Sequence, residues 1–217
     1  MSTRLKLELH GYWHAGSGRG EGPGADAVVV RTPAGLPYVP GRTLKGLLRE
    51  AVLQLAQCGQ GLEARRVEAL FGQRGARTAA EGEFSDDTVD ALTKGQGRFE
   101  VGSGVMRVSD ARLGATRDEQ RAWETWAASP SKEKAWKHLF QTLSSTAIEG
   151  DTGIARKGSL RSMEVAIPMT LYAFIECEEE SDWRKELERA LPLLRSLGAK
   201  RNRGFGRCTV TLEEVER

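Results

Sequence analysis

The sequence predicts an α+β fold with a largely antiparallel sheet, and three features of the apolar pattern indicate this class. Alternating apolar residues predict strands near both ends of the chain and again near residue 170. Apolar residues at helical spacing predict helices between those strands. The elements show no regular βαβ repeat. Strand, helix, strand, helix and strand in this order are the skeleton of a ferredoxin-like core, here with large insertions.

Composition describes one globular domain over residues 1–217, with 39% hydrophobic and 29% charged residues. The net charge of +2 hides separate acidic and basic stretches, so local charge is the better guide to partners. The three cysteines are widely spaced without CxxC pairs, which suits a reducing cytosol rather than disulfides or zinc. No apolar run approaches the roughly 18 residues that span a bilayer, so we expect a cytoplasmic protein without a membrane partner.

The first strand is predicted from about Arg4 to Trp13, because Leu5, Leu7 and Leu9 alternate with polar residues. The chain then passes through a glycine-rich connection and a short apolar run of valines. Three prolines exclude a regular helix before residue 41.

A helix is predicted next, with Thr43 as its N-cap. Its apolar positions have the spacing of one buried stripe: Leu44, Leu47, Leu48, Ala51, Val52 and Leu55. Lys45 and Arg49 are four residues apart on the polar side, so both point the same way. A second short helix is predicted over 62–71. Weak periodicity over about 73–104 indicates an insertion.

The middle of the chain is predicted to be mainly helical. Residues 105–113 are strand-like, and residues 118–143 are predicted as a helix broken at Pro130. Four aromatic residues at helical spacings are expected in the core: Trp123, Trp126, Trp136 and Phe140. Residues 144–162 have no consistent period and are rich in glycine and cations, which predicts a protruding loop or hairpin.

The last third returns to clear patterns. Alternation over 165–175 predicts one long strand, in which Pro168 favours an edge position or a bulge. Apolar residues over 183–197 mark one face of a helix that Pro192 should kink or split. Alternation over 208–212 predicts the last strand.

Three basic patches lie far apart in the sequence. Four cations and three glycines fall within residues 197–207, between a helical pattern and a strand pattern. Glycines permit tight turns, and free amides beside Lys and Arg form a concavity for phosphate. The patches either form a track for a polyanionic backbone or remain ordinary solvated surfaces. They comprise Arg42, Lys45 and Arg49; Arg156, Lys157 and Arg161; and Gly198, Lys200, Arg201, Arg203, Gly204, Gly206 and Arg207.

Few residues are candidates for catalysis. Asp26, in the glycine-rich connection, could hold a hard divalent cation and leave other positions to water and phosphate, although loop aspartates are often turn formers. Asp110 and Asp151 have weaker claims of this kind. His10 and His14 could act as general acid and base in metal-free RNA cleavage, because imidazole titrates near neutral pH. His10 falls on the polar face of the first strand, where simple exposure also explains it.

Several short motifs occur in one order over nearly the whole chain. They are residues 36–46, 70–72, 108–111, 146–148, 152–160 and the glycine-rich stretch near the C-terminus. Together they resemble the RAMP (repeat-associated mysterious protein) superfamily, close to the backbone subunits of type III CRISPR effector complexes.

The resemblance implies an RNA-recognition-motif-like core whose glycine-rich loop and first helix contact the backbone of a guide CRISPR RNA. It implies a thumb hairpin within about 144–162 that interrupts the guide–target duplex at regular intervals. The family's target-cleaving aspartate precedes the motif Pro-Gly-x-x-Leu-Lys-Gly, and Asp26 stands at that place. Asp26 is therefore expected to be catalytic and to bind a divalent cation, Mg²⁺ or Mn²⁺.

The sequence thus favours a backbone subunit of a type III CRISPR ribonucleoprotein effector that binds guide RNA and cleaves bound target RNA with a metal. Its expected partners are guide CRISPR RNA, target RNA and other subunits of the complex, including copies of itself. Two alternatives remain. One is a non-catalytic RAMP filament or cap subunit, and the other is a metal-independent CRISPR-RNA processing endoribonuclease that uses His10 or His14.

Overall fold

A four-stranded antiparallel sheet forms the centre of the computed structural model, which describes residues 3–18, 25–59, 64–72, 104–129, 135–178 and 182–214. The strand order is β2-β5-β1-β6. These strands are β1 (Thr3–Leu9), β2 (Met106–Val108), β5 (Thr170–Cys177) and β6 (Cys208–Glu214). The predicted insertion at 73–104 lies outside the described residues apart from Gly104.

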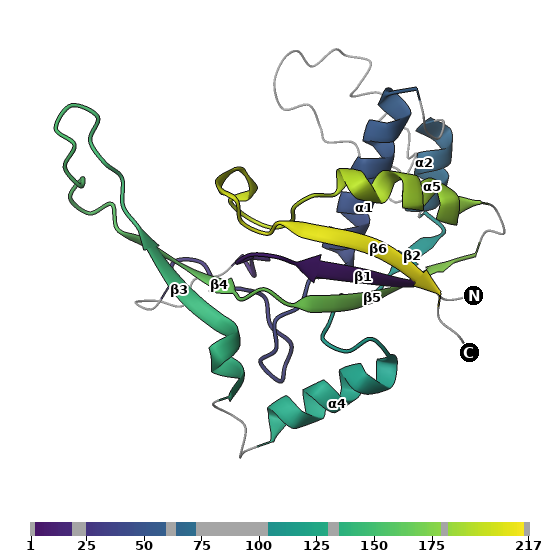
Figure 1. The fold of residues 1–217 in the computed structure, drawn as a ribbon, viewed down its shortest axis with the longest axis horizontal. Helices are drawn as coiled ribbons and strands as arrows, with labels where there is room; N and C mark the ends of the chain where they lie inside the picture. Colours follow the sequence, from purple (N-terminus) through teal and green to yellow (C-terminus); the bar gives the residue numbers. More distant parts are fainter. Residues whose placement is uncertain are drawn as a thin grey trace, which may run out of the picture.

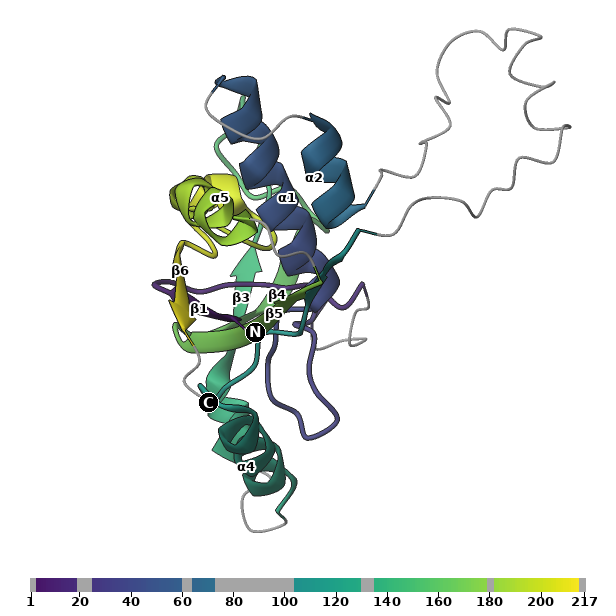
Figure 2. The same cartoon turned by 90° about the vertical axis from the view of Figure 1, so that its right-hand side faces the viewer.

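Helices lie on both faces of this sheet. One face is covered by α1 (Gly41–Gln57), α2 (Ala64–Phe71) and α5 (Trp183–Ala190) (Figure 1). On the other side lies α4 (Arg117–Ala128), as the edge-on view in Figure 2 shows. The predicted α+β class is therefore confirmed. None of the described helices is both long and apolar enough to cross a membrane.

The first strand buries the face that its alternation predicts, with Leu5 and Leu7 fully inaccessible. It ends at Leu9, four residues earlier than predicted. Beyond it, Trp13 pairs through an isolated bridge with Ala166, the last residue of β4 (Arg161–Ala166). Trp13 is fully buried and donates its indole N–H to the Ile167 carbonyl at 2.9 Å. The tryptophan thus joins the end of β1 to a different part of the chain.

The apolar stripe predicted for the first long helix is confirmed, but its predicted N-cap is wrong. The helix begins at Gly41, two residues before Thr43, and the Gly41 amide donates to Asp110 Oδ1 at 2.9 Å. A Cβ on Gly41 would lie 2.2 Å from the Val108 carbonyl oxygen, so glycine is needed where the helix meets β2. A cap supplied by a residue 69 positions away leaves no local sequence signal.

The break predicted near Pro130 is confirmed, because α4 ends at Ala128. The helix predicted beyond the break is wrong: a 3-10 turn occupies Ala135–Leu139, and β3 (Phe140–Ser145) follows it. The prediction that Trp123 is a core residue is also wrong, because this side chain is 40% exposed. Its ring lies 5.5 Å from that of Trp126, and both line an apolar surface cavity of about 440 Å³. Helical spacing identifies a shared face, but it does not show whether that face meets the sheet.

A hairpin made of β3 (Phe140–Ser145) and β4 (Arg161–Ala166) forms a second, two-stranded sheet and projects from the core (Figure 1). The single strand predicted over 165–175 is therefore wrong, because the break at Pro168 puts its two halves in different sheets. The second half, β5, is also an interior strand rather than an edge.

The predicted break at Pro192 is confirmed. The helix α5 ends at Ala190, and the proline lies in the 3-10 turn Leu191–Leu193 that follows. A proline ring cannot continue the α-helical hydrogen bonding, so the chain turns there toward the glycine-rich loop.

Candidate functional site

Asp26 is exposed and is joined by two hydrogen bonds to Ser162 on the hairpin strand β4. The Asp26 amide donates to the Ser162 carbonyl at 2.9 Å, and Asp26 Oδ2 accepts from the Ser162 amide at 2.8 Å. The carbonyl of the next residue, Ala27, accepts from the Glu164 amide at 2.9 Å. The connection that carries Asp26 therefore runs beside β4, which holds the carboxylate next to Ser162.

A buried ion pair lies behind this connection. Glu164 is 7% exposed, its Oε2 pairs with the Arg31 guanidinium, and its Oε1 accepts from the Val29 amide at 3.0 Å. The guanidinium also lies over the ring of Phe140 on β3, 4.1 Å from its centroid. Because a buried carboxylate is costly without partners, this network fixes the residues after Asp26 against both strands of the hairpin.

The two candidate histidines have different environments. His14 is 4% exposed, and its Nδ1 lies 2.7 Å from the Glu164 carbonyl oxygen. His10 is exposed, and its Nε2 lies 2.7 Å from Thr209 Oγ1. A general acid or base must reach its substrate within hydrogen-bonding distance. The burial of His14 therefore disfavours the metal-free mechanism that would use it.

The glycine-rich loop is a tight turn that presents cations to solvent. Its centre is the 3-10 turn Arg201–Arg203, flanked by Lys200 and Gly204 in left-handed conformations with φ of 54° and 84°. Arg201, Arg203 and Arg207 are exposed, and Lys200 is half-buried. Exposed cations around a tight turn suit an anion-binding surface.

The three glycines of this loop have different roles. A Cβ at Gly198 would lie 2.3 Å from the His14 carbonyl oxygen, and one at Gly206 would lie 1.9 Å from the Leu197 carbonyl oxygen. At Gly204, no described atom lies within 4 Å of the Cβ position. Two glycines therefore allow the loop to pack closely on the protein, and Gly204 leaves room for a ligand.

Residues 10–14 join this loop to the hairpin. The Gly206 amide donates to the Tyr12 carbonyl at 2.8 Å, while Trp13 exchanges backbone hydrogen bonds with β4. Tyr12 is 37% exposed, and its hydroxyl donates to Gln141 Oε1 on β3 at 2.9 Å. Sequence reasoning missed Tyr12. Alternation gave no signal for it, because the next two residues, Trp13 and His14, are both buried.

The cations of α1 form a separate basic patch: Arg42, Lys45 and Arg49. Together with Arg107, the first two line a cavity of about 490 Å³ beside β2. Lys45 Nζ donates to the Met106 carbonyl at 2.7 Å. Burial lowers the pKa of Lys45 below 10.5, and the neighbouring Arg49 charge lowers it further.

This α1 patch and the glycine-rich loop lie on different sides of the helix. Arg201 of the loop lines a cavity of about 110 Å³ together with Glu50 and Gln54 of α1. Gln54 is nine residues from Lys45, about half a turn away around the helix. The structure therefore separates the α1 patch from the loop, whereas residues 10–14 bring the loop and the hairpin base together.

The hairpin carries the third basic patch and an apolar tip. The exposed cations are Arg156, Lys157 and Arg161. Three exposed aliphatic residues, with exposed fractions of 60%, 66% and 73%, are Ile148, Ile154 and Leu160. Exposed apolar side chains grouped on a projecting element indicate a contact surface.

The RAMP superfamily model matches residues 6–209, a range that includes every predicted site residue. The chain belongs to the RAMP superfamily. No curated protein matches it. Two solved structures resemble this RAMP chain, each with a TM-score of 0.65 and 12% identity. One is a type III-B Cmr-beta structure in the apo state, with 99% of this chain and 98% of that chain covered. The other is type III-B Cmr-beta bound to cognate target RNA, with 98% and 97% covered. At this identity the likeness shows the fold.

A metal site in this RAMP chain would depend on few protein ligands. Within the described residues, no group of three His, Cys, Asp or Glu side chains is placed to hold a metal ion. Asp110, one of the weaker candidates, accepts from the Gly41 amide and pairs with Arg112. Asp26 still fits a hard cation, because Mg²⁺ keeps several waters and takes one or two carboxylates beside substrate phosphates.

Proposed function

We propose that this RAMP chain is a guide-RNA-binding backbone subunit of a type III CRISPR effector that cleaves bound target RNA. One observation carries the proposal. The cationic glycine-rich loop and Asp26 both attach to the strands of the projecting hairpin, the loop through residues 10–14 and Asp26 through Ser162. The fold shared with type III-B Cmr-beta structures, one bound to target RNA, supports it.

We also propose that the core is ferredoxin-like and that the β3–β4 hairpin acts as a thumb. The helix α1 follows β1, and α5 lies between β5 and β6. With β2 placed between α1 and β5, this gives the βαββαβ order of that fold. The other elements are insertions into it. A projecting hairpin with an apolar tip suits separation of paired bases, because such side chains can stack against them.

Guide RNA would lie across the glycine-rich loop and the hairpin base. The exposed loop cations and Arg161 would contact phosphates, as would Arg156 and Lys157 farther along the hairpin. Because the α1 patch faces another side of the helix, Arg42, Lys45 and Arg49 would contact a different part of the RNA. Such contacts bind any sequence, which suits a subunit whose guide varies.

Cleavage would be transesterification within the target strand. The 2′-hydroxyl loses its proton to water and its oxygen forms a bond to the adjacent phosphorus, while the bond to the 5′-oxygen breaks and that oxygen takes a proton from water. The products are a 2′,3′-cyclic phosphate and a 5′-hydroxyl. Distortion of the duplex by the hairpin would align the 2′-oxygen, the phosphorus and the leaving oxygen. Asp26 would hold Mg²⁺ or Mn²⁺ beside the reacting phosphate, where the cation would supply charge stabilisation.

The experiment compares Asp26→Asn and Asp26→Ala in the assembled complex with guide RNA. Asparagine keeps an oxygen that can accept from the Ser162 amide, whereas alanine removes it, so the pair separates charge from geometry. We expect both variants to retain guide RNA and to lose target cleavage. Asp118→Asn, which changes an exposed carboxylate on α4 away from the hairpin, is the matched control and should cleave normally.

The same assay distinguishes the non-catalytic filament or cap subunit. That alternative is favoured because, among the described residues, no group of three His, Cys, Asp or Glu side chains is placed to hold a metal ion. It yields no metal-dependent product from the wild-type complex. Full cleavage by Asp26→Asn would exclude Asp26 as the catalytic residue. Addition of a chelator should stop cleavage by the wild-type complex and leave guide binding intact.

A further inference from the structure

We propose that Tyr12 is a stacking platform for one nucleobase of the bound single-stranded RNA. The platform would lie where the glycine-rich loop meets the hairpin base. The inference rests on the proposed function and deepens it, because the loop cations named above reach phosphates of the guide RNA and Tyr12 reaches a base.

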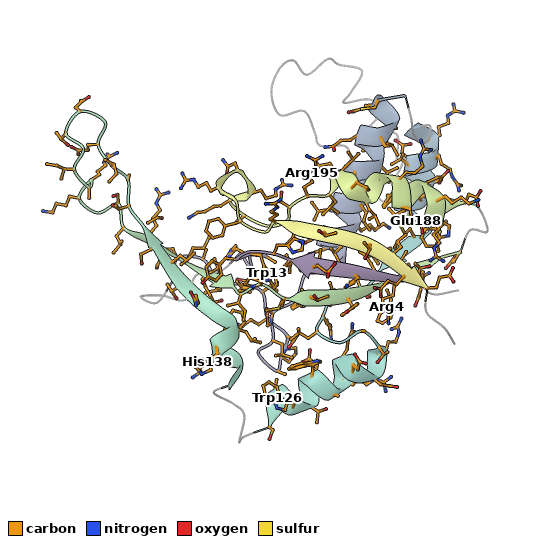
Figure 3. All side chains as sticks on the ribbon, in the orientation of Figure 1. Arg4, Trp13, Trp126, His138, Glu188 and Arg195 are labelled. Carbon is orange, nitrogen blue, oxygen red and sulfur yellow. The ribbon has the colours of Figure 1, made fainter. Side chains whose placement is uncertain are left out.

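Tyr12 is exposed, unlike the two residues that follow it. Trp13 is fully buried and donates its indole N–H to the Ile167 carbonyl, so it is anchored between β1 and the hairpin (Figure 3). Trp13 and His14 are both buried, whereas Tyr12 is 37% exposed. The ring of Tyr12 is thus the part of residues 12–14 that solvent can reach.

Two hydrogen bonds hold Tyr12 in this place. Its carbonyl accepts from the Gly206 amide at 2.8 Å, and its hydroxyl donates to Gln141 Oε1 at 2.9 Å. One bond belongs to the glycine-rich loop and the other to β3. A ring fixed in this way before binding loses little conformational entropy when a base stacks on it.

The surroundings of Tyr12 suit RNA. The turn of the glycine-rich loop lies close to the Tyr12 segment. The Gly204 carbonyl oxygen is 3.9 Å from the Cβ position of Gly11, the residue before Tyr12. The same loop exposes Arg201, Arg203 and Arg207. Single-stranded nucleic acid is commonly bound by cations that track the backbone and by aromatic rings on which bases stack. Tyr12 and the loop supply both parts side by side.

A purely structural role for Tyr12 makes a different prediction. If the residue only ties the loop segment to β3, its hydroxyl is the important group and loss of the Gln141 bond should matter most. If it stacks on a base, the ring is the important group. Tyr12→Phe removes the hydroxyl and keeps the ring, and Tyr12→Leu removes the ring, so the two variants separate these roles.

The test measures the affinity of the full-length chain for an unstructured oligouridine and an oligoadenosine. We expect Tyr12→Phe to bind like the wild type, and Tyr12→Leu to bind roughly 5- to 150-fold more weakly. The slope of log K against log salt should not change in Tyr12→Leu, because no phosphate contact is lost. Trp123→Leu is the matched control, because Trp123 is also an exposed aromatic residue but lies on α4, away from the glycine-rich loop. This variant should bind RNA with unchanged affinity.

A second measurement uses the wild-type protein and does not depend on the folding of a variant. RNA carrying 5-iodouridine forms photocrosslinks preferentially with aromatic rings that stack on it, and mass spectrometry should locate a crosslink at Tyr12. Equal affinity of Tyr12→Leu and wild type, or a weakened Tyr12→Phe, overturns the inference, as does the absence of this crosslink. Failure of the wild type to bind either RNA overturns the proposed function itself.

Discussion

Arg31 and Glu164 form an ion pair whose side chains are only 24% and 9% exposed, directly behind the connection that carries Asp26. Removal of one partner leaves the other charge without compensation in a poorly hydrated place. We expect Glu164→Ala to lower the free energy of unfolding by about 3 kcal/mol, at the lower end for buried pairs because Arg31 is partly hydrated. Urea denaturation of the purified chain measures this difference.

The control for that prediction is the double variant Arg31→Met/Glu164→Met. Replacement of both partners by apolar side chains of similar size removes the unpaired charge, so much of the lost stability should return. The amide of Val29 still loses its acceptor, so recovery should be incomplete. Equal loss of stability in the single and double variants would contradict this account.

Gly206 should be far less tolerant of substitution than Gly204, although both have positive φ. An alanine Cβ at Gly206 would lie 1.9 Å from the Leu197 carbonyl oxygen, whereas the described surroundings of Gly204 are open. We expect Gly204→Ala to cost about 1 kcal/mol from backbone conformation alone. Gly206→Ala should cost clearly more and lower the melting temperature. Equal melting temperatures of the two variants would show that the loop does not pack on Leu197 as described.

Neutralisation of a loop cation should reduce the salt dependence of RNA binding. If Arg203 contacts one phosphate, the slope of log K against log salt should fall by roughly 0.7 for single-stranded RNA in Arg203→Gln. Lys45→Gln should have a similar effect if the α1 patch also binds RNA. Arg184→Gln is the control, because Arg184 on α5 is paired with Glu188 and Glu214. An unchanged slope for Arg203→Gln would place this residue in solvent within the complex.

Lys45 should report RNA binding through its pKa. Burial, and then the charge of Arg49, lower this pKa below 10.5 in the free protein. Between the lowered pKa and 10.5, the unfolded chain binds more protons than the folded chain, so Lys45 makes stability rise with pH in that window. A nearby phosphate should raise the pKa, because it favours the ammonium form. Nitrogen-detected NMR titration of the lysine side chains, with and without RNA, measures both values, and identical values would argue against phosphate contact.

The sequence predicted those parts of the fold in which pattern and burial agree locally. Alternation identified the strands that became β1 and β6, and Pro192 marked the end of α5. Partners distant in the sequence caused the errors. The helix cap came from Asp110 rather than Thr43, and the two halves around Pro168 joined different sheets. The residues next to Gly41 and to Pro168 in the sequence do not indicate either of these partners.

The sequence predicted which segments contribute to the candidate site, but not how those segments lie relative to one another. Charge and glycine content identified the loop and the hairpin, and a motif resemblance identified Asp26. The adjacency of these parts depends on residues 10–14, whose bonds to Gly206 and to β4 bridge nearly the full length of the chain. The α1 patch lies apart from the loop, because one side of α1 faces β2 and another side faces Arg201 of the loop. Tyr12 gains its role only from that arrangement.

Trp13 has one more consequence. The hairpin strands are bonded to the core through Trp13 and through residues 26–31, so the direction of the hairpin is determined along these strands. The outer residues, about 147–158, do not take part in that attachment. They can therefore be shortened, lengthened or exchanged during evolution or engineering without a change in the direction of the hairpin. The residues that orient the hairpin differ from those at its outer end that would contact a ligand.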